Sequence, residues 1–172
     1  MATSSLYGPV EALDPKHDLD CFDCGSGCQT TWLRRHARQS HASGMSRVFV
    51  VRRLEEDRVV GFYALTTGSI LHAEPPERLL RGAGRYDLAL VILARLGVDL
   101  AEQGQGLGRA LVVDALHRVD LISSEAGARA LLIHAEDDDA KAFYLRLASF
   151  DQSPVDPRSL LLLMKDLRRA IG

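Results

Sequence analysis

The stretch GVDLAEQGQGLGRALVVDAL, residues 97–116, joins the end of an apolar segment to the start of a helical pattern. It contains four glycines, at positions 97, 104, 106 and 108, and apolar residues at helical spacing follow them. A helix start presents unpaired N–H groups and a partial positive charge, which attract anions such as phosphates. Glycines let the backbone approach an anion closely and adopt positive φ angles. The stretch therefore predicts a phosphate-binding turn between a strand and a helix, with a ligand-free glycine-rich connection as the alternative.

The segments around this turn predict the fold class. Residues 88–98, directly before it, are nearly all apolar, which is typical of a central buried strand. Residues 46–53 and 59–71 predict an antiparallel hairpin further upstream. The other expected elements are helices at 29–42, 107–127 and 138–148, a short helix and loop at 75–85, and strands at 128–135 and 160–164. This order predicts the α/β (α+β) class, a mixed central sheet flanked by helices on both faces.

Length and composition limit the function classes. The 172 residues are 47% hydrophobic and 26% charged, which predicts one globular domain over residues 1–172. No apolar run approaches the roughly 20 residues that cross a membrane, and the N-terminus lacks the pattern of a secretory signal. We therefore expect a cytoplasmic protein without membrane contact. The net charge of −2 requires any nucleic-acid-binding surface to be a local basic patch.

Three cysteines, Cys21, Cys24 and Cys28, lie close together, and His17 precedes them. This spacing would suit zinc, but a structural zinc site usually shows two ligand pairs, and the sequence has no second pair. We therefore predict no metal. An odd number of cysteines without a signal peptide favours reduced thiols in the cytoplasm.

The turn does not match two common phosphate-binding motifs. A P-loop needs Lys and then Ser or Thr after its last glycine, whereas Arg109 and Ala110 follow Gly108. The spacing G-x-G-x-x-G of dinucleotide-binding folds is also absent. What remains is Q-x-x-G-x-G, formed by Gln103, Gly106 and Gly108. This pattern resembles the pyrophosphate signature of the GNAT superfamily of acetyl-CoA-dependent N-acetyltransferases.

The resemblance continues in a later helix. The superfamily pattern N-x-x-A-x-x-x-Y is matched by Asp137, Ala140 and Tyr144, with Asp in place of the usual Asn. The resemblance implies acetyl-CoA as cosubstrate, with its pyrophosphate on the glycine turn and its thioester arm along the end of the preceding strand. The cofactor-binding residues implied in this way are Leu96, Gly97, Val98, Gln103, Gly104, Gln105, Gly106, Leu107, Gly108, Arg109, Asp137, Ala140 and Phe143.

A narrower resemblance covers most of the chain. The stretches DLDCFDCG, WLRRHA, RVFVV, VVGFYALTTGSI, VILARLGVD, GQGLGRALVVDAL, RALLIHAEDDDAKAFY and SPVDPRSLLL resemble the GNAT toxins of bacterial toxin–antitoxin pairs. This resemblance implies acetylation of the α-amine of aminoacyl-tRNA, which blocks translation. It also implies a ribbon-helix-helix antitoxin as partner and allows a homodimer.

Acetyl transfer from a thioester to an amine requires a neutral amine, a stabilised oxyanion and a proton for the departing thiolate. Tyr144 is the candidate proton donor, because a phenol of pKa about 10 is close enough to an alkyl thiol. The alternative for Tyr144 is a buried aromatic ring whose hydroxyl is simply hydrogen-bonded. A backbone N–H near Val98 is the candidate oxyanion donor. An α-amine of pKa about 7.7–8.0 needs little help, so His134 is either a base or a hydrogen-bonded structural residue.

The tRNA hypothesis needs cations for phosphate binding. Arg34, Arg35 and Arg38 lie on the first predicted helix, and Arg81 and Arg85 lie before the central strand. The alternative is an ordinary solvated surface. Two other functions stay open: an N-acetyltransferase acting on a small-molecule amine or a protein, and a protein that senses acyl-CoA without turnover. An intact Tyr144 argues against the sensor.

Overall fold

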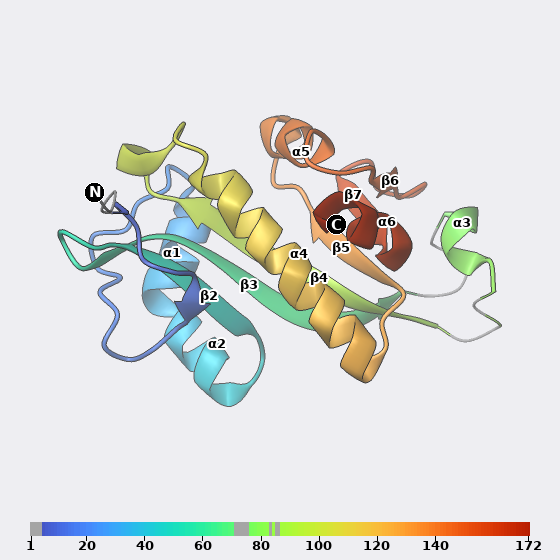
Figure 1. The fold of residues 1–172 in the computed structure, drawn as a ribbon, viewed down its shortest axis with the longest axis horizontal. Coiled ribbons are helices and arrows are strands. Elements are labelled where there is room, and N and C mark those ends of the chain that lie inside the picture. The colour runs from blue at the N-terminus through green and yellow to red at the C-terminus, as the bar shows by residue number, and fades with distance from the viewer. Residues whose placement is uncertain (1–4, 71–75, 83, 85–86) are drawn as a thin grey trace. The chain divides into compact units, whose positions relative to one another are not determined.

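The computed structural model describes residues 5–70, 76–82, 84 and 87–172 (Figure 1). Its helices are α1 (Gly27–Arg35), α2 (Ala37–Ser43), α3 (Glu77–Leu80), α4 (Leu107–Ala126), α5 (Asp138–Leu145) and α6 (Met164–Ile171). Its strands are β1 (Glu11–Ala12), β2 (Arg47–Arg53), β3 (Arg58–Ile70), β4 (Leu88–Val98), β5 (Ala130–His134), β6 (Asp151–Gln152) and β7 (Ser159–Leu163). No helix in this described part of the chain is long and apolar enough to cross a bilayer.

The strands are hydrogen-bonded in the order β1-β2-β3-β4-β5-β7-β6. β4 and β5 are parallel, whereas β1–β2, β2–β3, β5–β7 and β6–β7 are antiparallel pairs. The predicted mixed α/β sheet is therefore confirmed. The chain divides into two compact units, unit 1 (Met1–Leu65 and Arg95–Asp114) and unit 2 (Thr66–Ala94 and Ala115–Gly172). The single domain expected over residues 1–172 stays a prediction.

Unit 1 is built on the β2–β3 hairpin, whose two faces carry different helices. The alternation of side chains along a strand places Val48 and Val50 on one face, where they share a core with Leu33 of α1 and Ala37 of α2. Figure 1 shows these two helices beside the hairpin. The opposite face carries Gly61, where an added Cβ would lie 3.0 Å from Leu111 of α4. The first half of α4 thus packs on the second face, and this unit has helices on both faces.

Unit 2 is organised around β5. Its register with β4 runs from Leu90 opposite Ala130 to Leu93 opposite Ile133, and its other edge pairs with β7. β7 is buried along almost its whole length, as its run of four leucines predicts. The core of this unit contains Leu79, Leu88, Leu90, Ala130, Leu161 and Leu163.

One predicted helix was wrong in its extent, and three short elements were not predicted. The helix expected over 29–42 is interrupted at His36, whose φ of −119° departs from helical geometry. Helix α6 was not predicted, although Met164, Leu167 and Ile171 recur at helical spacing. The apolar run before α6 continues into its first residue, so strand and helix patterns overlap there. β1 and β6 were also missed, because two-residue strands are too short to show an alternating pattern.

Candidate active site

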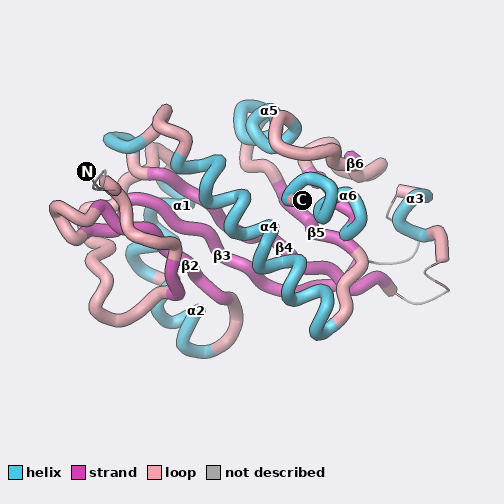
Figure 2. Tube along the Cα trace, in the orientation of Figure 1, coloured by secondary structure: helices cyan, strands magenta, loops and turns pink. Residues whose placement is uncertain are grey.

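The predicted phosphate-binding turn lies between β4 and α4 in unit 1, and Figure 2 shows strand, loop and helix in succession. Gly104 and Gly106 have φ angles of +82° and +84°. An added Cβ at either glycine would meet no atom within 4 Å. Glycine is therefore required here by the left-handed backbone conformation rather than by close packing.

The start of α4 leaves several donors available. The Gly106 carbonyl accepts the first helical hydrogen bond from Ala110 N–H at 3.1 Å. The N–H groups of Leu107, Gly108 and Arg109 precede that bond and have no acceptor among the described residues. No acidic residue lies in the first turn of this 20-residue helix. The turn thus offers N–H groups, an uncancelled helix dipole and the exposed Arg109 to an anion.

Two predicted cofactor residues have structural contacts in unit 1. The Gln103 side chain donates from Nε2 to the carbonyls of Cys24 (3.0 Å) and Val98 (2.9 Å), which fastens the turn to the end of β4. A Cβ on Gly97 would lie 2.9 Å from the Phe62 ring and 3.2 Å from Cys24 Sγ. Gly97 is therefore also required by packing, which the sequence analysis did not foresee.

The buried carboxylate of Glu102 lies directly before the turn and forms polar contacts with Tyr7 and Arg53. Glu102 is 2% exposed, accepts a hydrogen bond from the Tyr7 hydroxyl, and lies 2.7 Å from Arg53 Nη1. The hydrogen bond from Tyr7, followed by that from Arg53, holds the pKa of Glu102 below its usual range despite burial. The Tyr7 hydroxyl also lies 3.2 Å from Gln105 Oε1 of the turn itself. No sequence motif points to this cluster, since Tyr7 and Glu102 are 95 positions apart.

Glu102→Gln should lower the free energy of unfolding at pH 7 by about 1–3 kcal/mol, because the buried Arg53–Glu102 contact loses its charge. The folded-state pKa of Glu102 is depressed, so its contribution is complete above the unfolded pKa and is lost as the pH falls. The difference between parent and variant should therefore shrink below about pH 4. Urea unfolding of parent and variant at pH 7 and below about pH 4 measures this difference in the free energy of unfolding.

The control is Glu55→Gln, because Glu55 is 80% exposed and lies 3.9 Å from Arg53. It should change the free energy of unfolding by less than about 0.5 kcal/mol. Equal losses for the two variants would show that burial of Glu102 contributes nothing.

Helix α5 in unit 2 carries the second group of predicted residues. Asp137 is its N-cap, and the carboxylate accepts from Ala140 N–H at 2.8 Å. The Asp that replaces the usual Asn therefore has a structural contact of its own. Phe143 packs against the Tyr144 ring with centroids 5.3 Å apart.

Tyr144 combines a buried ring with a hydroxyl that has no hydrogen-bond partner in the described part of the chain. The residue is 7% exposed, yet no described residue hydrogen-bonds to its hydroxyl. Burial first, and the nearby Glu136 carboxylate second, raise the pKa of Tyr144 well above its ordinary value. The phenol is therefore protonated throughout the neutral range. The alternative role, in which the Tyr144 hydroxyl only makes a structural hydrogen bond, is not supported by any partner in the described part of the chain.

His134, at the end of β5, is hydrogen-bonded but not packed. Its side chain is 63% exposed, and Nδ1 lies 3.1 Å from both Ser159 Oγ and Asp156 Oδ2. A Ser-His-Asp relay needs its two partners on different ring nitrogens, so these three residues do not form one. Nε2 has no partner among the described residues, which leaves it accessible from solvent.

The five predicted arginines have different surroundings. Arg34 and Arg35 are exposed and line, with Asp20 and Thr31, a hollow of about 210 Å³ in unit 1. Arg38 instead donates from Nη2 to the His17 carbonyl at 2.8 Å. Arg81 lines a separate hollow in unit 2. Arg85 lies outside the described residues.

Cys21, Cys24 and Cys28 are free thiols, and Cys28 Sγ accepts a hydrogen bond from Arg95 Nη1 at 3.3 Å. The described residues contain no cluster of three or more His, Cys, Asp or Glu side chains suited to a metal ion.

The predicted site residues are divided between the two units. The turn residues belong to unit 1, whereas Asp137, Ala140, Phe143 and Tyr144 belong to unit 2.

No family model matches the chain. It is 42% identical over 168 residues to a tRNA-acetylating toxin of Mycobacterium tuberculosis, covering 98% of this chain and 99% of that protein. The structure of AtaT complexed with acetyl-methionyl-tRNA matches with a TM-score of 0.86 and 27% identity, over 95% of this chain and 99% of AtaT. A tyrosine-to-phenylalanine mutant of AtaT, bound to the C-terminus of the antitoxin AtaR and acetyl-CoA, matches with a TM-score of 0.82 and 25% identity, over 96% of this chain and 98% of the mutant. Identity of this extent along nearly the whole chain shows that it belongs to the GNAT family of tRNA-acetylating toxins.

Proposed function

We propose that the chain transfers an acetyl group from acetyl-CoA to the α-amine of the amino acid on charged tRNA and so stops translation. The observation that carries this proposal is the glycine turn, with its available N–H groups, in a chain 42% identical to a tRNA-acetylating toxin. In this proposal the pyrophosphate binds residues 103–109, and the thioester arm follows the backbone of 96–98. Asp137, Ala140 and Phe143 complete the cofactor site.

Tyr144 is the proposed proton donor. The neutral amine attacks the thioester carbon, the N–C bond forms, and the C–S bond breaks as the Tyr144 hydroxyl protonates the departing sulfur. A protonated phenol without a hydrogen-bond acceptor among the described residues supports this role. The α-amine, of pKa about 7.7–8.0, is substantially neutral at physiological pH and needs no strong base. His134 Nε2 is the group that could accept the released proton.

The decisive experiment mixes the purified protein with acetyl-CoA and a pool of charged tRNA. Nuclease digestion and mass spectrometry then detect N-acetylated aminoacyl-adenosine, which we expect. If a free amine or a peptide is acetylated while no such product forms, the chain is instead an acetyltransferase that acts on small molecules or proteins. Binding of acetyl-CoA without release of free CoA thiol would instead support the sensor.

Arg34 and Arg35 are the proposed contacts for tRNA phosphates in unit 1, because both are exposed and have no ion pair among the described residues. Arg34→Glu together with Arg35→Glu should raise the KM for charged tRNA at least about 10-fold and reduce its salt dependence. The acetyl-CoA Kd should stay at the parental value. Steady-state kinetics between 50 and 200 mM salt, roughly the range over which phosphate contacts weaken, measure both effects.

The matched control is Lys16→Glu, another exposed charge reversal in unit 1. It should leave the KM for charged tRNA unchanged. Equal effects of the two charge reversals would mean that the protein senses only overall charge, and Arg34 and Arg35 would not be contacts.

A ribbon-helix-helix antitoxin is the proposed protein partner, supported by the AtaT mutant solved with the C-terminus of its antitoxin AtaR. The proposed place of action is the cytoplasm, where charged tRNA is used, and the proposed assembly is a homodimer. Co-purification with the product of a neighbouring small gene, followed by light scattering, tests both the partner and the assembly.

A further inference from the structure

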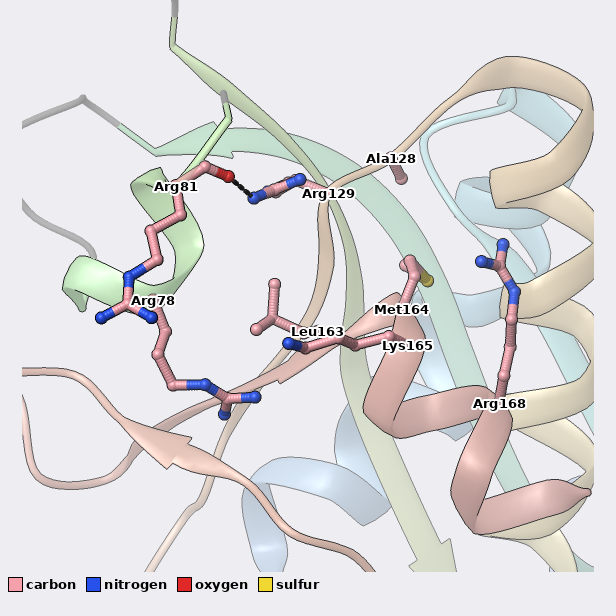
Figure 3. Close-up of a pocket in the computed structure, with 8 residues that line it drawn as sticks. All are labelled: Arg78, Arg81, Ala128, Arg129, Leu163, Met164, Lys165 and Arg168. Carbon is pink, nitrogen blue, oxygen red and sulfur yellow. Dashed lines mark hydrogen bonds between the residues drawn. The ribbon is translucent and has the colours of Figure 1, made fainter. Parts of the chain in front are cut away.

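Unit 2 contains a hollow of about 390 Å³ that is lined mainly by basic side chains (Figure 3). They come from three places: α3 and the residue after it, the residue directly before β5, and the first turns of α6. The basic residues are Arg78, Arg81, Arg129, Lys165 and Arg168, and the other lining residues are Ala128, Leu163 and Met164. None of the lining residues that the structure describes is aromatic or acidic.

Carboxylates hold two of the arginines in place. Arg78 lies 2.8 Å from Asp151 and 2.9 Å from Asp166, and Arg168 lies 2.7 Å from Asp120. These ion pairs orient the guanidinium groups and offset part of their charge.

The other three cations have no carboxylate partner among the described residues. Arg129 donates to the carbonyls of Leu79 (2.9 Å) and Arg81, which carry no net charge (Figure 3). Arg81 and Lys165 are exposed and have no ion pair or hydrogen bond from their side chains among the described residues. Five cations against three paired carboxylates leave about two positive charges at the hollow.

The chemistry of the lining selects phosphate groups. Arginine binds phosphate through two parallel hydrogen bonds, and lysine binds it as a point charge. The described lining residues offer no aromatic ring for a nucleobase to stack on, so they suit a sugar–phosphate backbone better than a free base.

Strand β5 leads from the hollow to His134, four residues before the start of α5. Arg129 directly precedes β5, and His134 ends it. At about 3.3 Å per residue, the five steps span about 17 Å. A ligand that contacts both the hollow and His134 must therefore extend along the strand, which a small amine cannot do.

We propose that this hollow binds backbone phosphates of the tRNA whose aminoacyl end reaches Tyr144, with Arg81 and Lys165 as the main contacts. The inference rests on the proposed function, since it identifies where the body of that substrate binds. It also explains how a chain with a net charge of −2 holds a polyanion, because the needed charge is concentrated locally.

The test is the double variant Arg81→Gln with Lys165→Gln. Loss of two phosphate contacts should weaken binding of uncharged tRNA roughly 10–40-fold at 0.1 M salt and lower the slope of log Kd against log salt by about 1.5. The KM for charged tRNA should rise similarly, while kcat at saturating tRNA and the acetyl-CoA Kd stay parental. A merely structural role would change these last two values as well.

Arg169→Gln is the matched control, because Arg169 lies on α6 beside Arg168 but does not line the hollow. It should leave tRNA affinity within about two-fold of the parent. A variant with Arg81→Lys alone should keep the parental salt slope, because the charge remains.

Parental tRNA affinity and slope in the double variant would overturn the proposal, even if the parent acetylates tRNA well. An equal loss in Arg169→Gln would overturn it too, since the hollow would then have no special role. A parent that binds tRNA through Arg81 and Lys165 but forms no acetylated product would support the hollow and contradict the proposed reaction. The experiment therefore tests tRNA binding at the hollow separately from acetyl transfer to the tRNA.

Discussion

Replacing Tyr144 with phenylalanine should lower turnover by roughly 10²–10⁴-fold, the usual size of general acid catalysis, and leave the acetyl-CoA Kd nearly unchanged. The substitution keeps the buried ring and deletes only the hydroxyl. Because that hydroxyl has no acceptor among the described residues, its loss should cost little folding stability. Single-turnover kinetics with charged tRNA measure the chemical step directly.

The control is Tyr63→Phe, because the Tyr63 hydroxyl donates to Asp114 at 2.5 Å in the core of unit 1. This variant should lose folding stability and keep most of its turnover. If Tyr144→Phe retains more than about a tenth of parental turnover, the proton donor is another group.

The pH profile gives an independent check on Tyr144. Its pKa is raised by burial and by Glu136, so the phenol keeps its proton as the pH rises past the ordinary tyrosine range. The rate should therefore increase with pH as the amine loses its proton, near 7.7–8.0 or below, and then level off. A falling limb below pH 9 would assign the donor to a more acidic group.

Gly106→Asp should weaken acetyl-CoA binding at least about 100-fold. The backbone at this position has φ +84°, where a side chain adds strain of about 1–3 kcal/mol. The new carboxylate would also stand at the N-terminus of α4, where the proposal places the pyrophosphate. Strain of one to two kcal/mol shifts the turn away from its binding conformation, which lowers the population that can bind, and therefore the affinity, by roughly 5–30-fold. Charge repulsion between the new carboxylate and the pyrophosphate adds to this loss. Isothermal calorimetry with acetyl-CoA measures the change.

Two further variants separate the contributions. Gly106→Ala introduces the strain without the charge, so its loss of affinity should be smaller than that of Gly106→Asp. Gly127→Asp places the same residue at φ +79° after the end of α4, again with no atom within 4 Å of the new Cβ. It should leave acetyl-CoA affinity unchanged. Parental affinity in Gly106→Asp would mean that the pyrophosphate binds elsewhere.

Local patterns in the sequence were sufficient for the elements around the turn. β4 was predicted at its observed bounds, and α4 within one residue at its end, because an apolar run and a helical period are properties of adjacent residues. The requirement for glycine at positions 104 and 106 is likewise local, since it depends on each residue's own φ. Tyr144 was singled out by resemblance, and its role stays a proposal.

Contacts between distant residues were decided only by the tertiary structure. Nothing near Glu102 in the sequence indicates that Tyr7 and Arg53 will surround its carboxylate, and nothing near Arg38 indicates that the His17 carbonyl will hold it. The same is true of the basic hollow, where Arg81 and Lys165 come from opposite sides of β5 in the chain. A sequence pattern records the spacing of residues along one helix or strand. Which charges are paired and which stay available depends on how those elements pack together.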